Sequence, residues 1–227
     1  MKPIDLAQQT LITAILQGDY PVGTPLPGER DLAAQLGVTR PTLREALRRL
    51  ETDGWLTIQQ GKSTIVRDYL HEGGLNVLNG IVRHSRNLPP DFVPNLLQIR
   101  LDLAPSYTRL AVQRAPKVLR TLLEKHTTLA DTPRAYAEYD WLLHHTLTVE
   151  SGNPIYALIL NGFVDFYVQL AETHYFIHDA ARQVSGDFYA ELLTYIRAGN
   201  VDEAAALTQR VMAASITLWQ IMHEAGR

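Results

Sequence analysis

Cysteine is absent from the chain, which excludes disulfide bonds, thiolate metal sites and cysteine nucleophiles. Long apolar runs are absent too. The longest strictly apolar run, Ile155 to Leu160, is far shorter than the roughly 20 residues that a membrane span requires. The first 20 residues carry acids, glutamines and a glycine rather than the apolar core of a signal segment. We therefore expect a cytoplasmic protein that makes no contact with a membrane.

The chain has no excess of basic charge, and its net charge of −3 by itself argues against a nucleic-acid partner. The charge is unevenly distributed, however. Residues 1–67 hold eight Lys/Arg against seven Asp/Glu, whereas the remainder holds thirteen against seventeen. Arg40, Arg44, Arg48 and Arg49 lie within ten residues that contain a single acid, Glu45. A local basic face of this kind is enough to meet the phosphates of a nucleic acid.

Sequence signatures of common enzymes are also missing. We find no glycine-rich phosphate loop, no Gly-x-Ser-x-Gly turn and no His-Glu-x-x-His helix. Asp140, His144 and His145 form the one cluster that suggests catalysis, and it lacks a nucleophile or a complete set of metal ligands. We therefore expect that the protein is not an enzyme.

The residue pattern predicts a mainly α protein with two domains. We expect a winged helix-turn-helix over residues 1–68, a linker and the start of the next helix over 69–78, and an all-helical bundle over 79–227. The paired glycines Gly73 and Gly74 would give the linker its freedom. Apolar spacing and helix-end residues then predict helices at roughly 74–87, 91–114, 116–129, 134–151, 154–175, 180–198 and 201–224.

The helix-turn-helix is predicted over residues 29–50. A short helix ends at Gly37, which permits a tight turn, and a second helix starts at Thr39, whose hydroxyl suits a helix cap. Residues 55–59 and 63–66 read as two strands of a hairpin, which would form the wing. The start of the second helix would enter the major groove, where arginine can form two hydrogen bonds to guanine.

Residues 27–33 (PGERDLA), 37–47 (GVTRPTLREAL) and 53–58 (DGWLTI) resemble the DNA-binding domain of the GntR family of bacterial regulators. The resemblance implies a homodimer on a pseudo-palindromic operator in double-stranded DNA, with the wing tip in the minor groove. The DNA contacts that we predict from the helix pattern and the resemblance are Glu29, Arg30, Thr39, Arg40, Thr42, Arg44, Gln60, Gly61 and Lys62.

Further segments resemble the FadR group within this family: 55–62, 74–78, 95–100, 151–162 and 174–176. That resemblance implies a long-chain fatty acyl-CoA effector that releases DNA and no other cofactor. It also implies repression of fatty-acid degradation genes and activation of unsaturated fatty-acid synthesis genes. The chain departs from the FadR pattern at Pro41, usually a small hydroxyl residue, and at Met212, usually glycine.

The FadR resemblance also implies a set of ligand-binding residues. Ser215 and Trp219 match positions tied to the acyl-CoA response, and Arg100, Tyr175 and Tyr189 match positions around the same pocket. Arg100 has an alternative role as the partner of a buried acid such as Asp140.

A competing hypothesis is a regulator of the same family that responds to a metal-bound organic acid. Asp140 and His144 match two ligand positions of such relatives, and their i, i+4 spacing places both on one helix face. The other two positions fall at Tyr189 and Val211, which are poor ligands, so we expect no metal site. Asp140 and His144 would then be a hydrogen-bonded pair inside the bundle.

Overall fold

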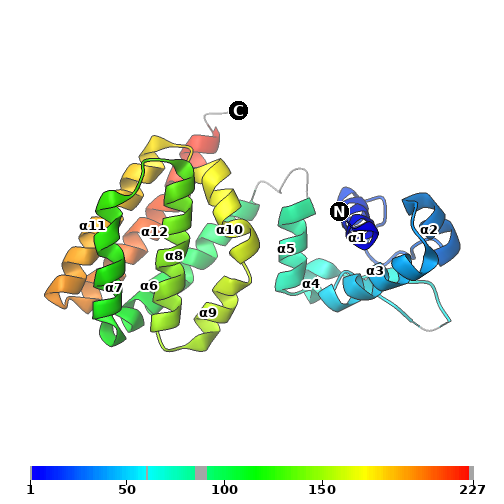
Figure 1. The fold of residues 1–227 in the computed structure, drawn as a ribbon, viewed down its shortest axis with the longest axis horizontal. Coiled ribbons are helices and arrows are strands. Elements are labelled where there is room, and N and C mark those ends of the chain that lie inside the picture. Colours follow the sequence, from blue (N-terminus) through cyan, green and yellow to red (C-terminus); the bar gives the residue numbers. More distant parts are fainter. Residues whose placement is uncertain (1, 60, 85–90, 225–227) are drawn as a thin grey trace. The chain divides into compact units, whose positions relative to one another are not determined.

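The computed structural model describes residues 2–59, 61–84 and 91–224. Contacts between residues divide the chain into two compact units, Met1–Leu88 and Pro89–Arg227, which are considered separately below. The chain runs from the short helices and hairpin of the first unit into the longer helices of the second (Figure 1). The predicted mainly α fold is confirmed.

The first unit is built on a helix-turn-helix. Its helices are α1 (Pro3–Gln17), α2 (Glu29–Leu36) and α3 (Arg40–Asp53), and its hairpin pairs β1 (Leu56–Thr57) with β2 (Ile65–Val66) in antiparallel fashion. Gly37 ends α2 with a φ of 65°, a left-handed conformation that glycine adopts without strain. The Thr39 side chain accepts a hydrogen bond from the Thr42 backbone amide at 3.3 Å and so caps α3 as predicted. Apolar faces of these elements form the core: Leu11, Leu32, Leu43, Leu50 and Trp55.

The segment expected to be a linker is partly helical. It contains α4 (Tyr69–Glu72) and leads directly into α5 (Leu75–His84). The ring of Tyr69 lies 4.9 Å from that of Trp55, and a Cβ atom on Gly80 would come within 2.5 Å of the same indole. α5 also packs against α1. Because the buried Trp55 is covered by these elements, packing places the end of the first unit after residue 88 rather than after residue 68.

The second unit is a helical bundle. Its α-helices are α6 (Phe92–Arg114), α7 (Pro116–Leu123), α8 (Pro133–Glu150), α9 (Pro154–Asn161), α10 (Val164–Leu170), α11 (Asp179–Ala198) and α12 (Val201–Glu224). α6 packs along α12 and α8, and α11 packs against α7 and α12. Side chains from these helices form the main core, including Ala104, Leu119, Leu143, Leu192 and Leu207.

Two predicted helices are shorter than expected. The helix expected at 116–129 ends at Leu123 and continues as a 3₁₀ turn over Glu124–Thr128. The helix expected at 154–175 breaks around Gly162, and α10 then runs into a π-helical turn over Ala171–Tyr175. Glycine is a poor helix former, and π turns often mark functional sites. Among helices in the described part of the chain, none combines the length and apolar character of a membrane span.

Candidate nucleic-acid interface and ligand slot

Three predicted DNA-contacting arginines lie on the surface of the helix-turn-helix. The side chains of Arg30, Arg40 and Arg44 are 84%, 57% and 55% exposed. Glu29, at the start of α2, brings the last two together. Its Oε2 atom lies 2.7 Å from Arg44 Nε and 4.0 Å from Arg40 Nη2. Glu29 therefore orients the arginines at the start of α3, and its carboxylate also reduces the positive charge that they present.

The two predicted threonines bind each other instead of standing free. Thr39 Oγ1 and Thr42 Oγ1 are 2.9 Å apart, and Thr39 Oγ1 also caps the helix. Pro41 lies between them in the first turn of α3 and is exposed. The first turn of α3 is thus fixed by local bonds, which orient the outward arginines.

The predicted wing tip lies in the turn between β1 and β2. Gly61 has a φ of 75°, which an L side chain rarely adopts, and Lys62 is exposed. The Lys62 amide donates to the Gln59 carbonyl at 3.1 Å. Gln60, the third predicted residue of this tip, lies outside the described residues.

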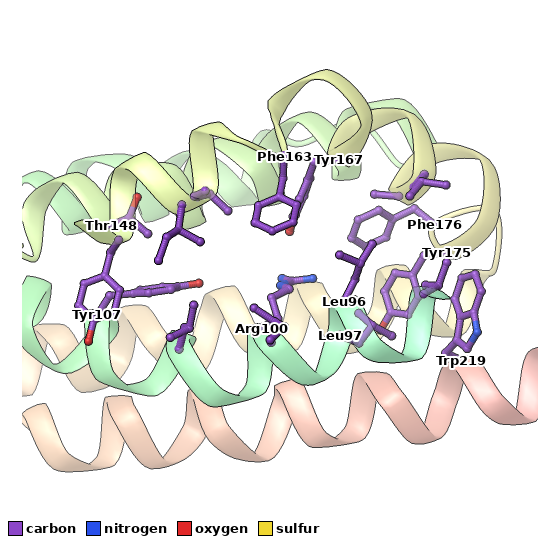
Figure 2. A pocket seen from close by; sticks show the side chains of 18 residues that line it. Leu96, Leu97, Arg100, Tyr107, Thr148, Phe163, Tyr167, Tyr175, Phe176 and Trp219 are labelled. Carbon is purple, nitrogen blue, oxygen red and sulfur yellow. The ribbon is translucent and has the colours of Figure 1, made fainter. Parts of the chain in front are cut away.

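The second unit contains a long apolar slot along α6 (Figure 2). One wall is α6 from Val93 to Tyr107, which corresponds to roughly 21 Å of helix at about 1.5 Å per residue. The opposite wall is formed by α9, α10 and the π turn, and Trp219 of α12 lies at one end. Most lining side chains are aliphatic or aromatic, among them Leu97, Leu103, Ile159, Leu160, Phe163, Leu170 and Phe176.

Arg100 is the charged residue of the slot wall, and it projects between α6 and α10 near the middle of the slot (Figure 2). Its Nη2 atom lies 2.8 Å from Asp140 Oδ2 and 2.7 Å from His144 Nε2. Arg100 and Asp140 therefore form the buried ion pair that the sequence suggested as the alternative role of Arg100. The His144 Nε2 and Asp140 Oδ1 atoms are 3.7 Å apart, so the predicted direct hydrogen bond between these residues is wrong. The Arg100 guanidinium bridges the two side chains instead.

Two tyrosines complete the bonds of Asp140, and a third bonds His144. Tyr167 donates to Asp140 Oδ2 at 2.5 Å and Tyr189 to Oδ1 at 3.2 Å. Tyr107 Oη lies 2.7 Å from His144 Nδ1. Because arginine can only donate, His144 Nε2 must accept, so the imidazole is neutral and carries its proton on Nδ1.

This arrangement explains the ionisation of the cluster. Burial, followed by the Arg100 charge, lowers the pKa of His144 to about 3. Burial alone would raise the pKa of Asp140, but the Arg100 charge, followed by the tyrosine hydrogen bonds, holds it below its usual value. Burial raises the pKa of Tyr167 and Tyr189 well above the usual value. At neutral pH the cluster therefore contains one cation and one anion, with neutral side chains around them.

The same contacts leave no room for a metal ion at Asp140 and His144. An ion bound by both side chains would have to take the position of Arg100 Nη2, which already contacts both. Within the described ranges, no group of three His, Cys, Asp or Glu side chains could hold a metal ion. The residues present do not fit the metal-dependent hypothesis.

The other predicted ligand-binding residues have different positions. Tyr175 and Trp219 line the slot. Tyr189 and Ser215 are buried and do not line the slot. Tyr189 donates to Asp140, and Ser215 donates to the Val211 carbonyl of its own helix. Met212, which departs from the FadR pattern, is buried in the main core rather than on the slot wall.

Sequence reasoning missed Phe163 and Tyr167, which line the slot opposite Arg100. Tyr167 also lies with its ring centre 5.5 Å from the Arg100 guanidinium carbon. The break around Gly162 gives α10, which carries Tyr167, its own start at Val164. Gly162 was the sequence signal for this helix break, although nothing in the sequence specified the direction of the helix that follows.

Comparison with known families matches both parts of the chain. Residues 4–66 match the bacterial regulatory proteins of the gntR family, and residues 67–225 match the FadR C-terminal domain. This family boundary lies close to the predicted one and assigns α4 and α5 to the second part, whereas packing groups them with the first unit.

Curated relatives match over nearly the whole chain. A fatty acid metabolism regulator protein of Shewanella sp. (strain MR-7) is 40% identical over 217 residues, covering 96% of this chain and 90% of the relative. The protein of the same name from Shewanella pealeana is 38% identical over 222 residues, covering 98% and 92%. A solved structure titled for Lar, which controls the Listeria monocytogenes agr system, shares the fold with a TM-score of 0.61, at 14% identity and 97% coverage of each chain.

These matches agree with the helix-turn-helix, the hairpin and the bundle described above, and they bear out the prediction of a regulator rather than an enzyme. The chain belongs to the GntR family of bacterial transcription regulators and carries a FadR-type C-terminal domain.

Proposed function

We propose that this protein regulates genes of fatty acid metabolism and that a long-chain fatty acyl-CoA, bound in the slot of the second unit, releases it from DNA. The observation that carries the proposal is the apolar slot along α6, since its lining residues on α6 span roughly 21 Å of helix, comparable to an extended long acyl chain. The names of the relatives, fatty acid metabolism regulator protein, support the same assignment.

On the DNA side, we propose that Arg40 and Arg44 read base edges in the major groove and that Arg30 and Lys62 contact phosphates or the minor groove. All four residues are exposed, and Arg40 and Arg44 lie at or near the start of α3. Two copies of the chain would occupy two half-sites about one helical turn apart, as dimeric helix-turn-helix proteins do. Repression would follow from occupancy of the operator.

On the effector side, we propose that the acyl chain lies along α6, with Trp219 and Tyr175 lining one end of its path. These two residues lie at the same end of the slot (Figure 2). Ser215 and Tyr189 do not line the slot, so each would act through a neighbour. Ser215 would act through Tyr175, and Tyr189 would act through Asp140.

The test is operator affinity, measured by fluorescence anisotropy at fixed salt because phosphate contacts make the affinity salt-dependent. We expect tight binding to a palindromic FadR-type operator and release by hexadecanoyl-CoA, but not by coenzyme A alone. Leu160→Trp fills the slot and should abolish release, whereas Leu158→Trp on the same helix, at a side chain that is 62% exposed, should not. Operator binding that ignores every long-chain acyl-CoA would refute the effector assignment.

A further inference from the structure

Two side chains on the slot wall carry buried polar atoms without a hydrogen-bond partner. In the described part of the chain these atoms are Asn79 Oδ1, His84 Nδ1, Arg100 Nε, Thr108 Oγ1 and Tyr175 Oη. Arg100 and Tyr175 line the slot, whereas the others do not. A buried polar atom without a partner is costly, so each such atom in a ligand site indicates a group that the ligand should supply.

Arg100 has one buried N–H group, Nε–H, that lacks an acceptor among the described residues. Its Nη2 atom is fully engaged by Asp140 and His144, but its Nε–H finds no acceptor among the described residues. The neighbouring Tyr167 hydroxyl donates to Asp140 and makes no hydrogen bond with this N–H, and Leu96, Leu103 and Phe163 are among the other residues of the slot wall. The described residues therefore offer this N–H no acceptor, so either water or a molecule in the slot supplies one.

Tyr175 presents a similar group near one end of the slot. The residue is 8% exposed, and its hydroxyl makes no hydrogen bond of normal length and angle to a described residue. Ser215 is close enough to interact with it, but no hydrogen bond of normal length and angle joins the two hydroxyls. Arg100 and Tyr175 both project from the walls toward the slot (Figure 2).

The missing partner should be a neutral oxygen rather than a carboxylate. Asp140 already neutralises the Arg100 charge at 2.8 Å, so a second buried anion would have no cation of its own. A plain alkyl chain would cover the Arg100 N–H and displace any water that bonds it without replacing the bond, which loses affinity. A hydroxyl or keto oxygen on the chain would supply the acceptor without adding charge.

We propose that the slot selects acyl groups that carry a hydroxyl or keto oxygen on the chain over plain acyl groups of the same length. Arg100 Nε–H is the principal donor to that oxygen, and the Tyr175 hydroxyl is the second partner. This inference rests on the proposed acyl-CoA function and names the chemical class of effector that the site binds best.

The test compares matched ligands on the intact protein by titration calorimetry. Hexadecanoyl-CoA is compared with its 3-hydroxy, 3-keto and 16-hydroxy forms, and octadecanoyl-CoA with its 12-hydroxy form. One additional hydrogen bond should make at least one oxygenated ligand bind roughly tenfold more tightly than its plain partner. If every oxygenated ligand binds as well as its plain partner or less well, the inference is wrong while the proposed function stands. If no acyl-CoA binds at all, both are wrong.

Two tyrosine variants locate the partner. Tyr175→Phe should reduce the preference for the oxygenated ligand several-fold, whereas Tyr156→Phe, the same change elsewhere on the slot wall, should leave it unchanged. A full preference retained in Tyr175→Phe would overturn the part assigned to Tyr175 and leave Arg100 as the donor. Loss of the preference in Tyr156→Phe alone would overturn the assignment of the oxygen to Arg100 and Tyr175.

Discussion

The two units use arginine–carboxylate pairs in opposite ways. In the helix-turn-helix, Glu29 pairs with Arg44 and Arg40, and both arginines remain more than half exposed. In the bundle, Asp140 pairs with Arg100, and these side chains are 4% and 18% exposed. Water screens the attraction between Glu29 and the two exposed arginines, so Arg40 and Arg44 are available to DNA. Water does not screen the buried Arg100 and Asp140 in this way, so each charge needs the other to offset the cost of its burial.

Breaking the buried pair should have the largest effect. Arg100→Leu leaves the Asp140 carboxylate buried without a counter-charge, and we expect the free energy of unfolding to fall by about 3–5 kcal/mol. Urea unfolding followed by tryptophan fluorescence measures this change.

The control lies on the same helix. Arg109 pairs with Asp202, but these side chains are 46% and 84% exposed, so Arg109→Leu should cost less than about 1 kcal/mol. Equal losses in the two variants would contradict the contrast between the buried and the exposed pairs.

Removing an exposed arginine should damage DNA binding and spare the fold. Arg44→Ala should weaken operator binding by about 1–3 kcal/mol, equivalent to roughly 5- to 150-fold, with unfolding almost unchanged. Arg197→Ala, which removes a similarly exposed arginine paired with Glu124 in the other unit, is the control for general charge loss. If anisotropy gives the same loss for both variants, Arg44 has no specific role at the DNA.

His144 should make the bundle sensitive to acid. Because the pKa of folded His144 is about 3 and that of an unfolded histidine is about 6.5, only the unfolded chain takes up this proton between those values. Stability should therefore fall as pH decreases from about 6.5, by up to about 1.4 kcal/mol per pH unit. Asp140, whose folded pKa is lowered, adds its own loss only below its unfolded value of about 4.

Urea unfolding at pH 7, 6 and 5 isolates the histidine contribution. His144→Gln should flatten this dependence, whereas His145→Gln should keep it, since the neighbouring His145 is only partly buried and binds Asn161 instead. An unchanged slope in His144→Gln would show that another group takes up the proton.

The smallest expected effect concerns Glu29. Glu29→Gln removes a negative charge from the face that we propose to meet phosphates and also loosens Arg44, so the two consequences oppose each other. We expect binding to scrambled DNA to increase by up to about fivefold, with a smaller gain for the operator. Anisotropy titrations with both DNAs at two salt concentrations measure the difference, and an equal change for both would mean that Glu29 does not orient Arg44.

The sequence by itself determined the helix-turn-helix in detail, because its signals are local. Thr39 caps α3, Gly37 closes the turn and the arginines follow at helical spacing, so neighbours along the chain decide where each side chain points. The pairing of Arg100 with Asp140 was one of two roles that the sequence suggested for Arg100.

Only the tertiary structure decided the rest of the slot. Arg100, Asp140, Tyr167 and Tyr189 come from four helices, and their contacts depend on how α10 turns after Gly162 and how α11 packs. The same long-range packing placed Ser215 and Met212 away from the slot and joined α5 to the first unit. Helical periodicity specifies which face of a helix is buried, but the partner of that face is set by packing among segments far apart in the sequence.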